Sequence, residues 1–217
     1  GGLKVITTLD KNMQDAAVAT AQKYTEEAAT KAKPKQDASQ LHVAISSVDT
    51  ATGGVLAMYG GPDYTTNSRN WSTTPRPAAS TFKSFATVAG LRNGYSLDST
   101  LKGDTFTPRG EGVPVRNEFS EQYGDVTLRK AVAESINTAF VDMTESMNNG
   151  PAAVIKAAND AGAPTGAGWD ANNRIALGAA EVSPLNMANA YATLADSGKR
   201  KDVHFVAKVV DRNGNTV

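Results

Sequence analysis

The chain contains no cysteine and only two histidines, His42 and His204. The first absence excludes a disulfide scaffold, a thiolate metal site and a cysteine nucleophile. The scarcity of histidine disfavours histidine-rich zinc sites and Ser-His-Asp triads, so a nucleophile here needs a different base. No glycine-rich phosphate loop of the Walker or dinucleotide type is present. We therefore expect no metal site and no cofactor.

An excess of charge of one sign is also lacking, because 22 lysines and arginines balance 22 aspartates and glutamates. This balance excludes a general attraction to nucleic acid or to an anionic membrane. No apolar stretch approaches the ~20 residues that a membrane span requires. The remaining composition, 40% apolar and 20% charged over 217 residues, is typical of one globular domain or most of a larger one.

The order of predicted elements favours an α+β fold, with an antiparallel β-sheet flanked by helices. Asp10 is placed to cap an alanine-rich helix over residues 11–33, and residues 41–48 and 55–59 predict a β-hairpin. Residues 95–125 lack periodicity, and a segment of that length is more often functional or mobile than a simple connector. Further helices are predicted over residues 80–92, 127–134, 138–147, 151–162 and 184–198.

Both ends of the chain resemble cut ends. The start at Gly1 and Gly2 does not resemble a signal peptide. Residues 203–210 alternate like a strand, residues 211–215 have turn chemistry, and two further residues begin a strand that does not continue. We expect an unfinished hairpin and interpret the chain as a piece of a longer fold.

Ser80 and Lys83 place a hydroxyl and an amine three residues apart at the start of a predicted helix. Residues at this spacing share a helix face, the helix N-terminus stabilises negative charge, and a lysine in a dry pocket can lose its proton near neutral pH. The pair has the chemistry of a nucleophile and its base. In isolation this spacing more often means a serine that caps the helix and a lysine in solvent. The same spacing occurs a second time, at Ser99 and Lys102.

Ser135 and Asn137 form a second candidate, at the break between two predicted helices. One bend would present a hydroxyl that relays a proton and an amide that holds a peptide by paired hydrogen bonds. The same spacing recurs at residues 68–70 and 146–148. In isolation the pattern more often means a loop whose serine and asparagine bond their own backbone.

The order of these segments resembles the transpeptidase domain of penicillin-binding proteins, particularly the bifunctional class A type. The opening of that domain is similar to LKVITTLD at residues 3–10, and its strand pair ahead of the active site to ATGGVLAMYGG at residues 51–61. Its nucleophile helix is similar to RPAASTFKSF at residues 76–85. Its second motif is similar to GDVTLRKAVAESIN at residues 124–137, and a later segment to residues 176–185.

The resemblance implies a β-lactamase/transpeptidase-like fold and D,D-transpeptidase chemistry, and it selects Ser80 over Ser99. Ser80 would attack the carbonyl between the two terminal D-alanines of a peptidoglycan stem peptide, with its own backbone N–H in the oxyanion hole. Lys83 would be the base, Ser135 would pass the proton to the departing amine, and Asn137 would hold the peptide and Lys83. An amine of a second stem peptide would complete the cross-link, whereas β-lactams would acylate Ser80 and stay.

The resemblance also implies the setting of the protein. Its partners would be stem peptides ending in D-Ala-D-Ala and β-lactam antibiotics, at the extracytoplasmic face of the bacterial cell membrane, where the full-length protein would be anchored. Its roles would be peptidoglycan synthesis, cell shape and antibiotic resistance. Residues 1–36 would be an N-terminal strand and helix leading into the domain, and residues 37–217 its N-terminal and central part.

The chain departs from the family pattern in lacking the third motif, Lys-Thr/Ser-Gly on a sheet strand. We expect that strand in the missing C-terminal part of the fold, as a C-terminal fragment of the same domain, and we expect the chain alone to be inert. A milder departure is Ala79, since the family more often has glycine before the serine.

Two alternatives stay open. A non-catalytic cell-wall binding or scaffold module is supported only by the absent third motif. A serine β-lactamase or β-lactam sensor would need a glutamate that activates water, carried in a Glu-x-x-Leu-Asn segment. Glu145 and Asn149 have the spacing of the first and last residues of that segment, but Asn148 stands at the position of its leucine.

Overall fold

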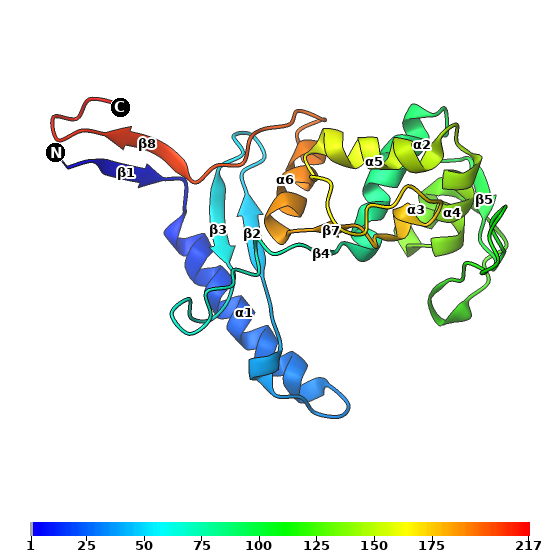
Figure 1. Ribbon diagram of the computed structural model, residues 1–217, viewed down its shortest axis with the longest axis horizontal. Helices are drawn as coiled ribbons and strands as arrows, with labels where there is room; N and C mark the ends of the chain where they lie inside the picture. Colours follow the sequence, from blue (N-terminus) through cyan, green and yellow to red (C-terminus); the bar gives the residue numbers. More distant parts are fainter. Residues whose placement is uncertain (1) are drawn as a thin grey trace. The chain divides into compact units, whose positions relative to one another are not determined.

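The computed structural model describes residues 2–217, and the chain divides into two compact units. One unit consists of Gly1–Pro75 and Ser183–Val217, and the other of Arg76–Val182. Helices and short strands occur in both (Figure 1). Within residues 2–217 the strands form four antiparallel pairs, which confirms the predicted α+β class.

The first unit is built on a strand pair covered by helices. Strands β2 (Ile45–Val48) and β3 (Val55–Tyr59) form the predicted hairpin. Helix α1 (Lys11–Lys31) packs against β3, and helix α6 (Pro184–Ala195) packs against β2 (Figure 1). A second pair joins β1 (Lys4–Thr7) to β8 (Val206–Val210), so the predicted C-terminal strand pairs with the N-terminal one.

Capping explains why α1 starts where it does. The Asp10 carboxylate accepts a hydrogen bond from the Met13 N–H at 2.9 Å, as the sequence predicted. Small side chains, Ala17 and Ala21, let the helix approach the strand and bury Ala57 and Tyr59 beneath it. A short 3₁₀ turn, η1 (Ala38–Gln40), follows the helix. No helix among the described residues is both long and apolar enough to cross a membrane.

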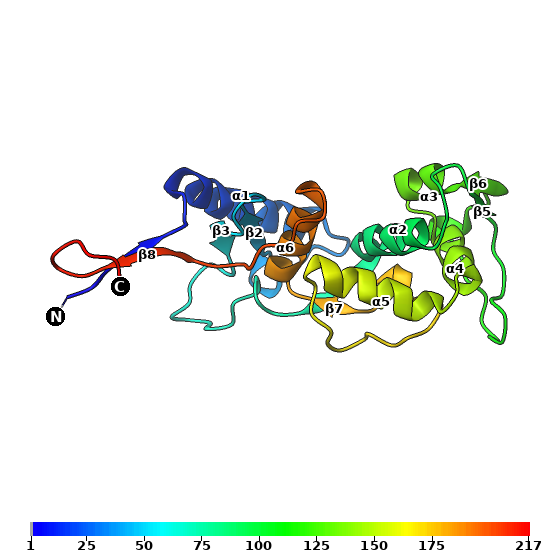
Figure 2. The same cartoon turned by 90° about the horizontal axis from the view of Figure 1, so that it is seen from above.

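The second unit is mainly helical, and Figure 2 shows α2 and α5 lying side by side, as their contacts require. Its helical segments are η2 (Ala79–Phe82), α2 (Lys83–Arg92), η3 (Glu118–Ser120), α3 (Leu128–Glu134), α4 (Asn137–Ser146), α5 (Gly150–Ala161) and η4 (Ile175–Leu177). Its strands pair as β4 (Arg76–Pro77) with β7 (Glu181–Val182) and β5 (Thr100–Lys102) with β6 (Asp125–Thr127).

The core of the second unit draws apolar side chains from helices that are far apart in the sequence. Phe82 makes edge-to-face contacts with Phe85 and Trp169, with ring centroids 5.3 and 5.2 Å apart. Gly90 of α2 lies so close to Met143 of α4 that a Cβ would come within 2.6 Å of the sulfur. The fully buried side chains include Phe82, Phe85, Leu128, Ile136, Phe140, Met143, Val154 and Ile175. This packing gives the site a rigid base.

The predicted helix boundaries in this unit agree with the structure to within a few residues. The break between α3 and α4 lies at Ser135 and Ile136, as predicted, and Gly162 ends α5 in a left-handed conformation (φ +115°). The predicted helix over residues 80–92 is present, although its first turn is the 3₁₀ helix η2. Strands β5 and β6 were missed, because an alternation over only three residues is too short to stand out in the sequence.

Candidate active site

Lys83 is the first residue of α2, and its side chain is buried, with 5% of the residue exposed. Its Nζ lies 3.2 Å from Ser80 Oγ and 2.9 Å from Ser135 Oγ. One turn of η2 places Ser80 beside the amine. The bend after α3, 52 residues later in the chain, supplies the second hydroxyl. The structure therefore brings the two sequence candidates together around one nitrogen.

Two carbonyl oxygens hold this amine at shorter distances than the hydroxyls do. Lys83 Nζ donates to the Ser135 backbone carbonyl at 2.6 Å and to Asn137 Oδ1 at 2.6 Å. Carbonyl oxygens only accept, so they engage two hydrogens of the amine. An uncharged amine has no third hydrogen and presents its lone pair to the hydroxyls. In this geometry a neutral Lys83 can accept the Ser80 proton.

The surroundings of Lys83 raise the fraction of the amine that is uncharged near neutral pH. Burial lowers the pKa of Lys83 from 10.5 to about 8, and the charge of Glu118 opposes this shift. The four hydrogen-bond partners are uncharged, and the Phe140 ring centroid lies 5.7 Å from Nζ. At pH 7 a pKa near 8 leaves roughly a tenth of the lysine neutral, several hundred times more than for an unperturbed side chain.

Two strained residues shape the backbone of the site. Ser135 has left-handed torsion angles (φ +56°, ψ +44°) at the end of α3, and both its carbonyl and its hydroxyl contact Lys83. Ala79, directly before Ser80, is also left-handed (φ +50°). Such conformations cost about 1–2 kcal/mol for a residue with a Cβ, so the surrounding contacts must hold them.

The segment around Gly178 holds the strained turn before Ser80. The Ala79 N–H donates to the Gly178 carbonyl at 2.9 Å, and the Ala78 N–H donates to the Ala180 carbonyl at 2.9 Å. Gly178 is left-handed (φ +80°), and a Cβ there would lie 2.0 Å from the Ala79 carbonyl oxygen. Only glycine permits this approach. Sequence reasoning noted this segment by its resemblance but assigned it no role.

Asn137 is fixed at both ends of its amide. Its Oδ1 accepts from Lys83, and its Nδ2 donates to the Arg116 carbonyl at 3.1 Å. The neighbouring Asn117, 8% exposed, accepts from the Thr138 N–H at 3.1 Å and from the Thr138 hydroxyl at 3.2 Å. Its own Nδ2 donates to the Gly103 carbonyl at 2.7 Å. The loop that carries residues 116–117 is therefore attached to the first turn of α4.

Sequence reasoning did not find Asn117. It lies in the segment over residues 95–125 that we expected to be functional or mobile, but no periodicity or spacing marks it. Glu145, the candidate for a water-activating role, instead accepts a hydrogen bond from the Arg109 N–H at 3.0 Å, and its side chain lies 3.8 Å from Lys102. The described residues contain no cluster of histidine, aspartate or glutamate that could hold a metal ion.

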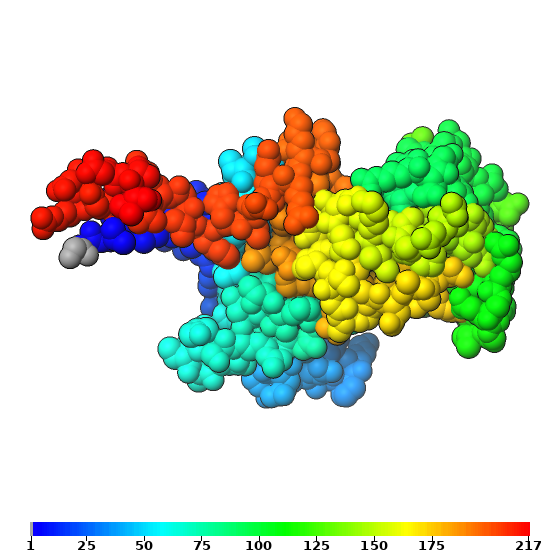
Figure 3. All heavy atoms as spheres, turned by 45° about the horizontal axis from the view of Figure 1, so that its top comes forward, coloured from blue at the N-terminus to red at the C-terminus, as the bar shows by residue number. Residues whose placement is uncertain are grey.

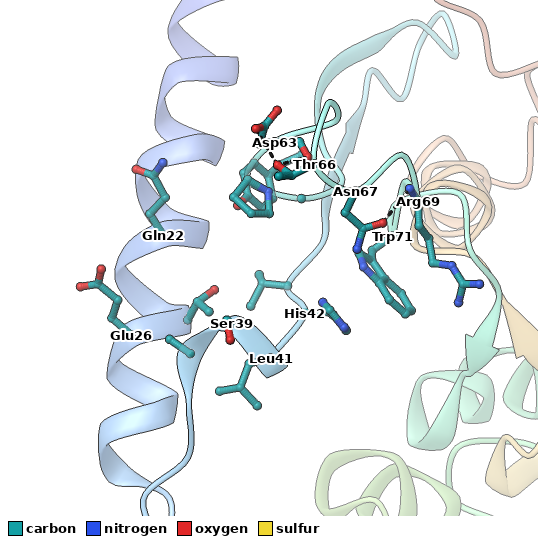
Figure 4. A pocket seen from close by; sticks show the side chains of 16 residues that line it. Gln22, Glu26, Ser39, Leu41, His42, Asp63, Thr66, Asn67, Arg69 and Trp71 are labelled. Atoms are coloured by element: carbon teal, nitrogen blue, oxygen red, sulfur yellow. Dashed lines mark hydrogen bonds between the residues drawn. The ribbon is translucent and has the colours of Figure 1, made fainter.

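A separate cavity of about 330 Å³ lies within the first unit, between α1 and the loop that follows β3 (Figure 4). His42 stacks on Trp71 with ring centroids 4.2 Å apart, and the Arg69 guanidinium lies 5.2 Å from the Trp71 ring. The lining of this cavity includes Ser39 but no lysine. It therefore lacks a serine–lysine pair, and we assign the candidate active site to Ser80 and Lys83.

Comparisons with known proteins identify the family to which the chain belongs. Residues 43–217 match the model of the penicillin-binding protein transpeptidase domain. The whole chain is 35% identical, over 228 aligned residues, to penicillin-binding protein 1A of Mycolicibacterium smegmatis and covers 27% of that protein. The chain therefore belongs to the penicillin-binding protein transpeptidase family, which confirms the resemblance. It spans about a quarter of the length of the curated relatives it matches.

Solved structures confirm the fold. The penicillin-binding protein PonA1 from Mycobacterium tuberculosis superimposes with a TM-score of 0.84 at 31% identity, over 100% of this chain and 56% of that chain. PonA1 in complex with penicillin V gives a TM-score of 0.83 at 30% identity, over 100% of this chain and 57% of that chain. The predicted domain boundary after residue 36 stays a prediction, since the family match begins at residue 43.

Proposed function

We propose that this chain is part of a D,D-transpeptidase that cross-links peptidoglycan stem peptides through an acyl-enzyme on Ser80. The observation that carries the proposal is the buried Lys83 amine, which lies 3.2 Å from Ser80 Oγ and 2.9 Å from Ser135 Oγ. Membership of the penicillin-binding protein transpeptidase family supports the same chemistry. So does the similarity to PonA1, whose complex contains penicillin V.

Acylation follows from the positions of three side chains. Uncharged Lys83 accepts the Ser80 proton as Oγ attacks the carbonyl carbon between the two terminal D-alanines. The negative charge on the carbonyl oxygen develops near the first turn of η2, whose leading N–H groups have no partner within the helix. Ser135, 2.9 Å from the amine, passes the proton to the nitrogen of the departing D-alanine as the C–N bond breaks. An ester on Ser80 remains.

Transfer reverses these proton movements. An amine of a second stem peptide attacks the ester carbonyl, loses a proton towards Ser135 and Lys83, and forms the new amide as Ser80 recovers its hydrogen. A β-lactam acylates Ser80 through its ring amide. Its leaving nitrogen stays tethered to the adduct, so it continues to block the acceptor side of the site.

In this proposal Asn137 holds both Lys83 and the stem peptide, and only the contact with Lys83 is present in the structure. Its hold on Lys83 is a 2.6 Å hydrogen bond. Its hold on the stem peptide requires a substrate carbonyl to replace the Arg116 carbonyl, which now accepts from Nδ2 at 3.1 Å. The amide would then bridge base and substrate, which aligns the scissile bond with Ser80.

The proposal extends to partners and location. The partners are stem peptides that end in D-Ala-D-Ala and β-lactam antibiotics, and the site works at the extracytoplasmic face of the bacterial membrane. We also propose that a segment outside residues 1–217 supplies the third motif, because these residues contain no Lys-Thr-Gly or Lys-Ser-Gly. Of the two rival functions, the same absence favours a non-catalytic module that binds the cell wall.

Labelling with fluorescent penicillin tests the proposal in the protein in which residues 1–217 occur. A stable adduct that mass spectrometry locates on Ser80, lost in Ser80→Ala and kept in Ser99→Ala, is the expected result. A label that disappears within minutes would identify a hydrolase. Failure to label, under conditions in which PonA1 is labelled, would favour the scaffold function.

A further inference from the structure

Two segments outside the nucleophile helix orient the reacting groups of the candidate active site. In the η4 turn, the Gly178 carbonyl accepts from the Ala79 N–H at 2.9 Å, directly before the nucleophile. In the loop over residues 108–117, the Arg116 carbonyl accepts from Asn137 Nδ2 at 3.1 Å, and the other end of this amide holds the amine of the proposed base. One segment therefore fixes the backbone before the nucleophile, and the other fixes the amide that holds its base.

The side chain of Arg174 joins these two segments. Its Nε lies 2.8 Å from the Glu111 carboxylate, and its Nη2 donates to the Val113 carbonyl. These partners lie 63 and 61 residues away along the chain. The side chains of Arg174 and Glu111 are only 31% and 26% exposed. Because the planar guanidinium binds a carboxylate and a carbonyl at once, its orientation is fixed, which a single surface ion pair does not achieve.

The backbone of Arg174 is fixed as well, at the start of the η4 turn. Its N–H donates to Asn172 Oδ1 at 2.8 Å, and its carbonyl accepts from the Leu177 N–H at 2.9 Å. Gly178 follows, and its N–H donates to the Ile175 carbonyl at 3.1 Å. A single 3₁₀ turn therefore connects the guanidinium to the carbonyl that holds the residue before the nucleophile.

The 108–117 loop is attached to two different parts of the second unit. The Arg109 N–H donates to the Glu145 carboxylate at 3.0 Å, and Asn117 Oδ1 accepts from the Thr138 N–H at 3.1 Å, so both ends of the loop are bonded to α4. The segment between these ends binds the guanidinium of Arg174 instead. The loop lies on the surface of the second unit, in green in Figure 3. Arg174 thus connects the α4 side of the site, which carries the amide, to the η4 side, which supports the nucleophile.

We propose that Arg174 is a positioning residue for acylation, which fixes the loop behind Asn137 relative to the turn behind Ser80. Within residues 2–217, no hydrogen bond or ion pair joins Arg174 to Ser80 or to Lys83, so it acts through Glu111 and the backbone. Without the guanidinium, nucleophile and base meet less often at hydrogen-bond distance, and water reaches the amine more easily. This inference rests on the proposed transpeptidase function.

The experiment measures penicillin acylation of the intact protein in which residues 1–217 occur. Arg174→Met should lower the maximal acylation rate constant ~5–50-fold at pH 7 and change the dissociation constant of penicillin less than ~3-fold. Arg174→Lys keeps the charge but not the planar fork, so it should recover only part of the rate. Arg92→Met is the matched control, because Arg92 pairs with Asp160 at the same 2.8 Å and joins α2 to α5. Its rate should stay within ~2-fold.

The pH dependence of acylation distinguishes positioning from a direct effect of charge. Glu111→Gln removes a negative charge, which by direct electrostatics would move the midpoint of the rate to lower pH. A loosened loop admits water to the amine of Lys83 and should move the midpoint up instead, by ~0.3–1 pH unit. Arg174→Met should shift it in the same direction, and Arg92→Met should not. Glu111→Gln and Arg174→Lys carry the test if Arg174→Met does not fold.

Three results would separate this proposal from its rivals. Unchanged midpoints and rates in Arg174→Met and Glu111→Gln would show that their contact serves only the fold, and would overturn the positioning role. Weaker binding of penicillin at an unchanged acylation rate would assign Arg174 to direct binding of the ligand, which also overturns it. A wild-type protein that penicillin does not label at Ser80 would instead refute the transpeptidase function itself.

Discussion

Two serine–lysine pairs with identical spacing lie in the second unit, and only one has become a candidate active site. Lys83 is 5% exposed, and hydroxyl and carbonyl oxygens surround its amine. The side chain of Lys102 is 54% exposed and pairs with Asp142 at 3.1 Å. Ser99 accepts a hydrogen bond from the Ser96 N–H at 2.9 Å within its own turn. Spacing alone therefore carries no catalytic information.

What separates the two pairs is the environment of the amine. Burial lowers the pKa of Lys83 to about 8, although the Glu118 charge opposes the shift, so a fraction of the amine is neutral and available as a base. Lys102 has no such environment: its side chain is 54% exposed and its amine lies 3.1 Å from the Asp142 carboxylate. The same residue types therefore give a candidate nucleophile with its base in one place and an ion pair to a largely buried carboxylate in the other.

The largest expected effect comes from removing each amine in turn. Lys83→Met should lower the rate constant of penicillin acylation by ~10²–10⁴-fold, because Ser80 loses its base. Lys102→Met should change it less than ~2-fold, although it should cost about 1–3 kcal/mol of stability, because the largely buried Asp142 carboxylate loses its cation. Stopped-flow acylation and urea unfolding measure the two quantities. Similar losses of acylation in both variants would contradict the distinction between the pairs.

The next effect tests the backbone that holds Ser80. Gly178→Ala should destabilise the protein by about 2 kcal/mol and slow acylation, because a Cβ there meets the Ala79 carbonyl at 2.0 Å. Gly94→Ala is the matched control: Gly94 is also left-handed (φ +89°), but nothing lies within 4 Å of its Cβ position. It should cost only about 1 kcal/mol and leave acylation unchanged. Equal effects on acylation would argue against support of Ser80 by Gly178.

The pH dependence of acylation should follow Lys83. Its pKa of about 8 lies below the ordinary 10.5, so the protonated and inactive amine predominates at pH 7. The rate should rise about tenfold per pH unit below pH 8 and level off above it. Glu118 raises this pKa, so Glu118→Gln should move the midpoint to lower pH, whereas Lys102→Met should not. A rate that is constant between pH 6 and 8 would exclude neutral Lys83 as the base.

The smallest effect concerns the residue before the nucleophile. Ala79→Gly should remove the strain of the left-handed alanine (φ +50°), although glycine also adds freedom to the unfolded chain. The net gain in stability should be at most about 1 kcal/mol, and acylation should stay within ~3-fold. Thermal unfolding and penicillin labelling provide the measurements. A clear destabilisation would mean that the Ala79 methyl group packs against the site.

Local signals in the sequence predicted much of the second unit. Helices α3 and α5 were predicted over residues 127–134 and 151–162, because the residues that end them, Ser135 and Gly162, act on their neighbours in the chain. The contact between Ser80 and Lys83 follows from their three-residue spacing on a helical turn. Strands β5 and β6 and the role of Asn117 were not predictable in this way, since their partners are distant in the chain.

By itself the sequence determined that any nucleophile must work without cysteine, that a serine and a lysine share one helical turn, and that a bend presents Ser135 and Asn137. Only the tertiary structure decided which serine–lysine pair is buried and that the bend meets Lys83 across 52 residues. The physical reason is that helix caps and turns arise from neighbouring residues. The pKa of an amine depends on which distant side chains exclude water from it.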